Sequence, residues 1–418
     1  MYLLSIELLI IKVMTGIEKK LNELKKWSEQ AKDNFLTIYA NVDPSKPENQ
    51  GDSWKTRIKN SLKEIPEIRN RDGKRDQTLY DLAINLIDEL RPEARTFALF
   101  IHRDIHDKIY YERLDLQIDI PVVDIANGRI QARYGEPYLT PLWFAVDEYE
   151  RTGILLLSEK KWRFFEIFLG EIVEDNELFN TIASDDWKTL KEINEKISQE
   201  LDSRALKPGG RFDKLSYKER STARLSPWIQ KLYKTLGRLL EKSVDQLHID
   251  RIILVGENWQ TGYFETFLSK RIQQKIIANV TSWPGVDECS PQTLWRKIEP
   301  IVIDHERKKE LMLIKEIKDQ PGLWGIDEVL NAVQMGRVKT WVLPWSLNIN
   351  VWICNTEKLV SSSREILEQF CDSPKLVQLR EIVIDLASEF GANIEFVRGD
   401  AEKQLIEEMN SMAALLRW

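Results

Sequence analysis

Apolar residues in the first third of the chain have helical spacing in some stretches and alternate with polar residues in others. Helical spacing covers residues 17–31, 53–65 and 77–90, and strand patterns cover residues 35–42, 97–101 and 108–116. Because helices and strands are interspersed, the pattern predicts an α/β domain. We place the end of this domain at residue 138, since Tyr134-Gly135-Glu136-Pro137 is typical of a linker.

The middle of the chain, residues 139–287, combines two strand arrangements. The apolar segments 142–146, 153–157 and 162–169 are joined by short charged turns, which predicts an antiparallel meander. Further along, the order strand, helix, strand predicts a parallel crossover, so the sheet of this second domain is expected to be mixed. The crossover elements are predicted over residues 252–256, 263–274 and 275–280.

Trp283-Pro284-Gly285 marks the last boundary, and residues 288–418 form the third predicted domain. Its helices and strands alternate along the chain, so the predicted fold is three α/β domains, the last of them an α/β sandwich. The helices are predicted over residues 291–318, 326–333 and 375–390, and the strands over residues 338–343 and 393–397.

Charge is distributed unevenly along the chain. The 418 residues carry a formal charge of −7, which disfavours nucleic-acid binding over the whole surface. Residues 204–242, however, hold eleven Lys and Arg against three acidic residues, a local charge of +8. The preceding residues 171–202 hold ten acidic residues against three Lys. Any RNA contact is therefore expected to be local and to involve the basic stretch.

The basic stretch begins with a glycine-containing loop. Pro208 biases Lys207 toward an extended conformation, and Gly209 and Gly210 permit backbone angles that a Cβ atom would forbid. An amphipathic basic helix follows, and Ser226-Pro227 is a suitable start for it. Such a loop is often a simple surface turn, and such a helix a solvated face. The combination nevertheless predicts an exposed Gly-Gly loop and a cationic helix that face a polyanion.

Cysteine usage and hydropathy indicate a cytoplasmic protein. Cys289, Cys354 and Cys371 are an odd number spread along a long chain, so no disulfide framework is expected and a reducing compartment is favoured. The apolar run 3–13 is too short to span a bilayer and has no basic region before it. We therefore expect no signal sequence and no membrane association.

Neither a metal nor a nucleotide cofactor is expected. His102 and His106 are four residues apart, but the surrounding pattern is strand and turn, so the two imidazoles do not share a helical face. Gly256 ends a buried strand without the further glycines or the Gly-Lys-Ser/Thr of a phosphate-binding loop.

Several motifs, taken in order, resemble the archaeal and eukaryotic class-one release factors, Pelota and their bacterial relatives. Residues 325–338 read Gly-Ile-Asp-Glu-Val-Leu-Asn-Ala-Val-Gln-Met-Gly-Arg-Val, like the helix-to-strand step of the family's third domain. Phe390-Gly391-Ala392 and Leu416-Arg417-Trp418 match the end of that domain. The meander, Gly-Gly loop, basic helix and Gly-ended strand match the middle domain in order, so the resemblance covers about residues 140–418.

The resemblance implies a ribosome-binding protein that acts in translation termination or in the rescue of stalled ribosomes by hydrolysing peptidyl-tRNA. The hydrolytic loop would be Gly209, Gly210 and Arg211, although the family has Gln where this chain has Arg211. No Asn-Ile-Lys-Ser codon-reading motif is present, which favours rescue over stop-codon reading. The cations expected to contact rRNA or tRNA are Lys207, Lys214, Lys218, Arg220 and Arg224.

Two functions remain open at this point. Hydrolysis of the ester needs a positioned water and backbone N–H groups but no protein nucleophile or metal, so Arg211 is compatible with catalysis. Arg211 is equally compatible with a non-catalytic, Pelota-like ribosome-binding or RNA-binding adaptor, in which it contacts phosphate. The resemblance also implies a protein partner of the third domain.

Overall fold

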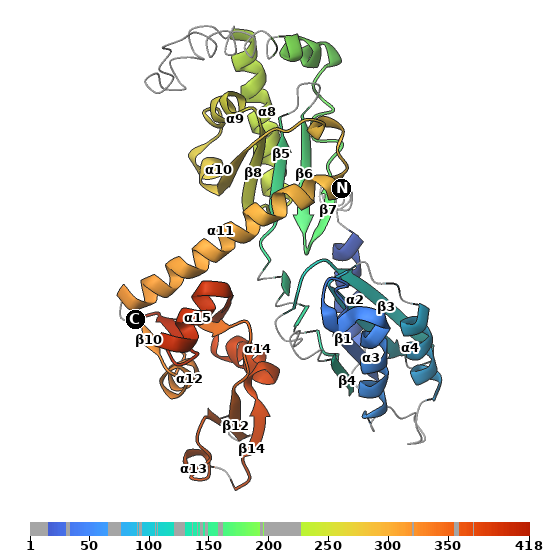
Figure 1. Ribbon diagram of the computed structural model, residues 1–418, viewed down its shortest axis with the longest axis vertical. Coiled ribbons are helices and arrows are strands. Elements are labelled where there is room, and N and C mark those ends of the chain that lie inside the picture. The colour runs from blue at the N-terminus through green and yellow to red at the C-terminus, as the bar shows by residue number, and fades with distance from the viewer. Residues whose placement is uncertain are drawn as a thin grey trace, which may run out of the picture. The chain divides into compact units, whose positions relative to one another are not determined.

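The computed structural model shows a mixed α/β chain, whose described residues form four sheets, and this confirms the predicted fold class (Figure 1). The chain divides into two compact units, residues 1–18 with 149–301 and residues 19–148 with 302–418. The domain limits expected at residues 138 and 287 stay predictions. The structure describes residues 16–30, 34–65, 77–89, 91, 94–104, 106, 108–120, 130–135, 137–139, 141–142, 145–146, 149–157, 162–192, 195, 227–319, 322–354, 359–370 and 372–418.

The first unit is built on a five-stranded sheet in the order β7-β6-β5-β8-β9. Strands β5, β6 and β7 are antiparallel neighbours, whereas β8 is parallel to both β5 and β9, so the predicted mixed sheet is confirmed. The strands are β5 (Thr152–Leu156), β6 (Arg163–Phe168), β7 (Glu171–Glu174), β8 (Arg251–Gly256) and β9 (Ile276–Thr281).

Helix α8 (Pro227–Gln246) begins where the sequence predicts the basic helix to begin. The crossover from β8 to β9 contains two helices, α9 (Asn258–Glu265) and α10 (Lys270–Lys275), where the sequence predicts one. Ser269 separates them, because its extended backbone precedes the first residue of α10. The short helix η4 (Val286–Glu288) follows β9, and the long helix α11 (Pro291–Asp319) then begins.

The second unit contains the sheet of the first third of the chain, in the antiparallel order β3-β2-β1-β4. Helices α3 and α4 bury Trp54, Ile58 and Leu79 against one face of this sheet. The elements are α2 (Gly16–Gln30), β1 (Phe35–Asn41), η2 (Pro47–Asp52), α3 (Ser53–Lys63), α4 (Gln77–Glu89), β2 (Thr96–Arg103), β3 (Ile109–Leu116) and β4 (Ile130–Gly135).

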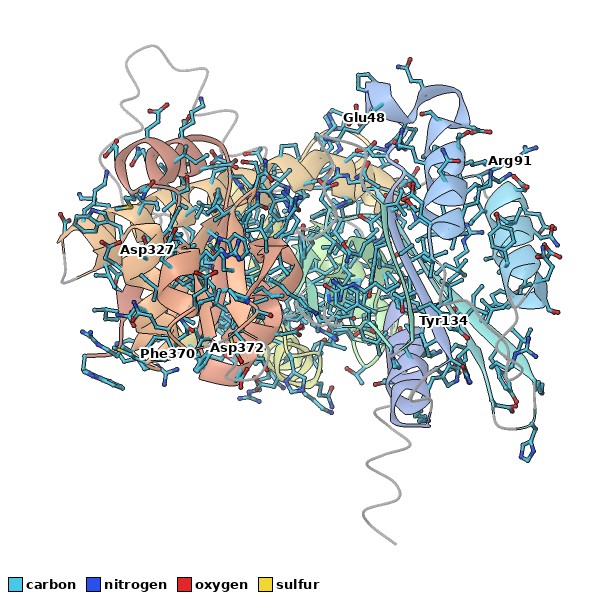
Figure 2. The ribbon with its side chains drawn as sticks, turned by 90° about the horizontal axis from the view of Figure 1, so that it is seen from below. Glu48, Arg91, Tyr134, Asp327, Phe370 and Asp372 are labelled. Carbon is cyan, nitrogen blue, oxygen red and sulfur yellow. The ribbon has the colours of Figure 1, made fainter. Side chains whose placement is uncertain are left out.

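Two expectations for this region are wrong. Tyr134, labelled in Figure 2, and Gly135 lie in β4 rather than in a linker, because this half-buried edge strand pairs with β1 but has no strong apolar run. The segment 142–146 is not a strand, since its described residues are helical. Leu142 and Ala145 are fully buried at helical spacing, and a short apolar run does not by itself distinguish a helix from a strand.

The last third of the chain folds around a second sheet of this unit, β10-β16-β11-β15, with helices on both faces. Helices α12 and α14 pack on Trp341, while α11 and α15 pack on Val342, so the predicted α/β sandwich is confirmed. The elements are β10 (Leu323–Trp324), α12 (Ile326–Gln334), β11 (Val338–Pro344), α14 (Leu379–Phe390), β15 (Asn393–Val397), α15 (Gly399–Glu408) and β16 (Ala413–Leu416).

A small three-stranded sheet, β13-β12-β14, adjoins α12 and α14. It is formed by β12 (Asn350–Cys354), β13 (Leu359–Ser361) and β14 (Lys375–Gln378), with α13 (Arg364–Leu367) after β13. The helix predicted over residues 375–390 therefore begins only at Leu379, because β14 pairs with β12. Cys354 is buried and disulfide-bonded, which differs from the expectation that the cysteines form no disulfide framework. Cysteine spacing along a chain does not show which thiols the fold brings together.

Within the described residues, no helix is long and apolar enough to cross a membrane.

Candidate functional site

The core of the first unit is an aromatic cluster centred on Trp162, whose exposed fraction is 1%. Its ring centroid lies 4.7 Å from that of Phe264, 5.3 Å from that of Tyr233 and 6.4 Å from that of Trp187. Burial among these rings raises the pKa of the Tyr233 hydroxyl above its usual value, so this hydroxyl stays neutral. Aromatic pairs of this kind stabilise a core beyond their buried area.

The cluster holds the two helical segments that flank residues 196–226. Trp187 belongs to the helical residues 184–192, and the buried side chains of Trp187 and Leu190 anchor this acidic segment to the core. Tyr233 belongs to α8, which follows those residues. Both flanks therefore pack on the same Trp162 side chain.

Helix α8 is amphipathic, with a fully buried face that includes Ile229, Leu236 and Leu240. The opposite face carries four exposed cations at spacings of three, four and four residues, which places them along one stripe. We call these residues the α8 stripe: Lys231, Lys234, Arg238 and Lys242.

The cations of the α8 stripe form no ion pair with any carboxylate in the described part of the chain. The acidic residues of the same helix are engaged elsewhere. Glu241 accepts a hydrogen bond from the backbone N–H of Ser269 at 2.9 Å. Asp245 accepts two from the guanidinium of Arg271, at 2.6 and 3.0 Å. The stripe is therefore an uncompensated positive surface on a helix fixed by its buried face.

All site residues predicted from the sequence fall within residues 196–226, outside the described residues, so their roles stay predictions. They are the loop residues Gly209, Gly210 and Arg211 and the cations Lys207, Lys214, Lys218, Arg220 and Arg224. The sequence predicted that the cationic helix faces a polyanion, but it named none of the four residues of the α8 stripe as site residues. The spacing of these cations was the signal that could have identified them.

His102 lies in β2, with its ring stacked between Phe35 and Tyr110 at centroid distances of 5.7 and 5.2 Å. Its exposed fraction is 4%, and burial lowers the pKa of the imidazole, which favours the neutral form. Asp104 accepts hydrogen bonds from the backbone N–H groups of His106 and Lys108, closing the turn between β2 and β3. Among the described residues, no group of three His, Cys, Asp or Glu side chains is arranged to hold a metal ion.

The motifs of the last third make internal contacts. Gly325 has φ +102° and donates its N–H to the carbonyl of Met412 at 2.9 Å. The side chain of Arg417 donates to the carbonyl of Val338 at 3.0 Å and to that of Gly391. The two terminal motifs thus meet each other and β11, which explains them as requirements of the fold.

Comparison with known proteins supports the sequence resemblance in the region of the α8 stripe. Residues 137–301 match bacterial archaeo-eukaryotic release factor family 10. The uncharacterized protein YocB of Bacillus subtilis (strain 168) is 19% identical over 275 residues, covering 63% of this chain and 94% of YocB.

Solved structures that match the chain include the archaeal termination factor aRF1, at 14% identity and a TM-score of 0.23, covering 96% of this chain and 97% of aRF1. They also include archaeal Pelota from a ribosome-bound complex with ABCE1, at 12% identity and a TM-score of 0.39, covering 95% and 94%. Dom34 of S. cerevisiae has 11% identity and a TM-score of 0.38, covering 77% and 81%. All three TM-scores lie below 0.5, so the support for the resemblance comes from the match over residues 137–301. That match confirms the resemblance predicted from the sequence for residues 137–301, which are similar to the bacterial archaeo-eukaryotic release factors.

Proposed function

We propose that this protein binds the ribosome in the cytoplasm and acts in translation termination or in the rescue of stalled ribosomes, by hydrolysing the ester bond of peptidyl-tRNA. The observation that carries the proposal is the family match, because residues 137–301 contain both the Gly209-Gly210-Arg211 loop and helix α8. The absence of an Asn-Ile-Lys-Ser motif from the sequence favours rescue over stop-codon reading.

Hydrolysis of the peptidyl-tRNA ester does not require a catalytic side chain. Attack of water on the ester carbonyl places negative charge on its oxygen, and backbone N–H groups oriented toward that oxygen stabilise the charge. Gly209 and Gly210 allow the backbone to approach a crowded RNA cavity, since neither has a Cβ atom. Arg211 stands where the family has Gln, so hydrolysis would depend on main-chain groups at this position.

The structure supports this assignment through the base of the loop. The segments on both sides of residues 196–226 pack on Trp162, which fixes their positions relative to the sheet. A site that must be presented at a defined position benefits from support by a rigid scaffold. The exposed cations Lys231 and Lys234 lie in the first turns of α8. They are therefore close in sequence to the Gly-Gly loop, which precedes this helix.

A release assay on ribosomes that carry a labelled peptidyl-tRNA tests the proposal. Wild-type protein should release peptide above the ribosome-only background. Gly210→Ala should abolish release, because a Cβ atom obstructs both the backbone angle and the approach. Arg211→Gln should retain or raise the rate, and Arg211→Ala should do less harm than Gly210→Ala.

The same assay decides between hydrolase and adaptor. Arg211 is the observation that favours the adaptor, since it replaces the family's Gln with a phosphate-binding side chain. Ribosome-bound wild type that releases no peptide, with weaker ribosome binding in Arg211→Ala and unchanged binding in Gly210→Ala, would refute hydrolysis and leave a non-catalytic ribosome-binding protein.

We also propose that the last third of the chain offers a protein-docking surface. Apolar side chains are exposed around α13 and β14: Ile366 by 50%, Phe370 by 59% and Leu376 by 54%. Phe370 is labelled beside Asp372 in Figure 2. Exposed apolar groups of this size gather at protein interfaces more often than elsewhere on a surface.

A further inference from the structure

We propose that the α8 stripe is a binding site for the sugar-phosphate backbone of double-helical RNA, separate from the predicted Gly-Gly loop. The choice of RNA among polyanions rests on the proposed ribosomal function. The site itself rests on four residues that the structure describes: Lys231, Lys234, Arg238 and Lys242.

The length of the stripe suits a phosphate backbone. With a rise of about 1.5 Å per residue, the eleven-residue separation of Lys231 and Lys242 places them about 16 Å apart along α8. In double-stranded DNA one strand carries a phosphate about every 3.4 Å of axis, and the spacing in an RNA duplex is of the same order, so this length spans several phosphates. The row of four cations is therefore long enough to contact more than one phosphate of a duplex backbone.

The charge of the stripe is available to a ligand. Glu241 and Asp245, the carboxylates nearest its C-terminal end, are held by Ser269 and Arg271. The apolar face of α8 is buried in the core, so its backbone is already ordered and loses little entropy on binding.

The composition of the stripe favours a duplex over a single strand. Single-stranded sites present aromatic side chains on which bases stack. The two aromatic residues of α8 do not serve in this way, because Tyr233 is fully buried and Trp228 packs against the core cluster. A row of cations without a stacking surface contacts phosphates and reads no sequence.

Fluorescence anisotropy with the full chain and a labelled RNA duplex of about 20 base pairs tests the inference. The variant is Lys234→Glu with Arg238→Glu, which reverses the centre of the stripe. The control is Lys315→Glu with Lys403→Glu, which replaces exposed cations on α11 and α15. It changes the net charge by the same amount as the stripe variant. Circular dichroism shows that each variant is folded.

The expected result is a loss of duplex affinity of about tenfold or more in the stripe variant and little change in the control. The slope of log affinity against log salt should fall by about two in the stripe variant, close to one for each lost phosphate contact. Wild type should bind the duplex more tightly than a single strand of equal length.

Equal losses in both variants, an unchanged salt slope, or preferred binding of the single strand or of anionic phospholipid vesicles would overturn the inference. Failure of the proposed function has a different signature, because duplex binding by the isolated chain requires neither a ribosome nor hydrolysis. Stripe-dependent duplex binding without peptide release supports the inference and counts against the hydrolase. Peptide release by the wild type, together with unchanged duplex affinity in the stripe variant, supports the hydrolase and refutes RNA binding by the α8 stripe.

Discussion

Helix α8 and the motif-bearing last third both carry the resemblance to release factors, but their distinctive residues are used in opposite ways. The cations of the α8 stripe are exposed, with no carboxylate partner in the described part of the chain. In the last third, Gly325 and Arg417 make hydrogen bonds to backbone carbonyls of the same fold. A matching motif therefore identifies a fold requirement in one region and a surface available to a partner in the other.

This difference predicts which measurements respond to mutation. Substitutions in the last third should change stability and leave RNA binding of the folded protein unchanged. Substitutions in the α8 stripe should change RNA binding and leave stability within about 0.5 kcal/mol, as is usual for exposed side chains. Substitutions in the core beneath α8 should change both properties.

The largest effect is expected for Trp162→Ala. The change removes the ring on which both Trp187 and Tyr233 pack, and deletions of a buried Trp cost about 3–5 kcal/mol of unfolding free energy. Hydrogen exchange of β5 and β6 should accelerate accordingly, and duplex RNA affinity should fall because the base of α8 is loosened. Trp162→Phe, which keeps an aromatic ring, should have a smaller effect on both. If Trp162→Ala loosens β5 and β6 but leaves the RNA affinity unchanged, RNA binding by the α8 stripe does not depend on the packing of α8 against Trp162.

The second prediction concerns a buried charge in the last third. Glu310 accepts a hydrogen bond from the backbone N–H of Arg398 at 3.0 Å and lies 2.9 Å from the guanidinium of Arg307. Burial raises its pKa from 4.5 to about 7, the charge of Glu395 adds to this shift, and the arginines oppose it. A group with a raised folded pKa stabilises the fold below pH 4.5, and that stabilisation is lost as the pH rises through about 7.

The unfolding free energy, measured by denaturant unfolding between pH 5 and 8, should therefore fall with rising pH by at most about 3 kcal/mol. Glu310→Gln should flatten this dependence, because the amide does not titrate. Glu316→Gln, on the exposed side of the same helix, is the control and should leave the pH profile unchanged. The same profile in Glu310→Gln and wild type would refute the assignment.

Periodicity predicted the elements that have their own local signal and missed those that depend on distant partners. The start of α8 was predictable because Pro227 suits the first turn of a helix and apolar residues follow at helical spacing. Strand β4 was not, since its half-buried residues become a strand only by pairing with β1. The hydrogen bond that Arg163 donates to the carbonyl of Cys289, at 3.1 Å, was not predictable either, because the two residues are far apart in sequence.

The candidate site was predictable to a similar extent. Local charge identified the basic stretch, and helical spacing within it defines the α8 stripe. The aromatic cluster that supports both flanking segments arises from Trp162 and from rings on β6, residues 184–192, α8 and α9, and only the fold brings these rings together.

The smallest effect is expected for Gly325→Ala, and it gives the sharpest contrast with the stripe. Gly325 adopts φ +102° and ψ +146° immediately before α12, a conformation that residues with a side chain rarely adopt. An added Cβ atom would also meet the carboxylate of Glu328, although that flexible group can move. Alanine should therefore cost about 1–3 kcal/mol of unfolding free energy, measured as faster hydrogen exchange in β11 and β16. Asn331→Ala, at an exposed position of α12, is the matched control and should be neutral or slightly stabilising. Duplex RNA affinity should be unchanged in both variants, because the fold requirement and the RNA contact belong to different regions. A loss of RNA affinity in folded Gly325→Ala protein would show that the two regions are energetically coupled.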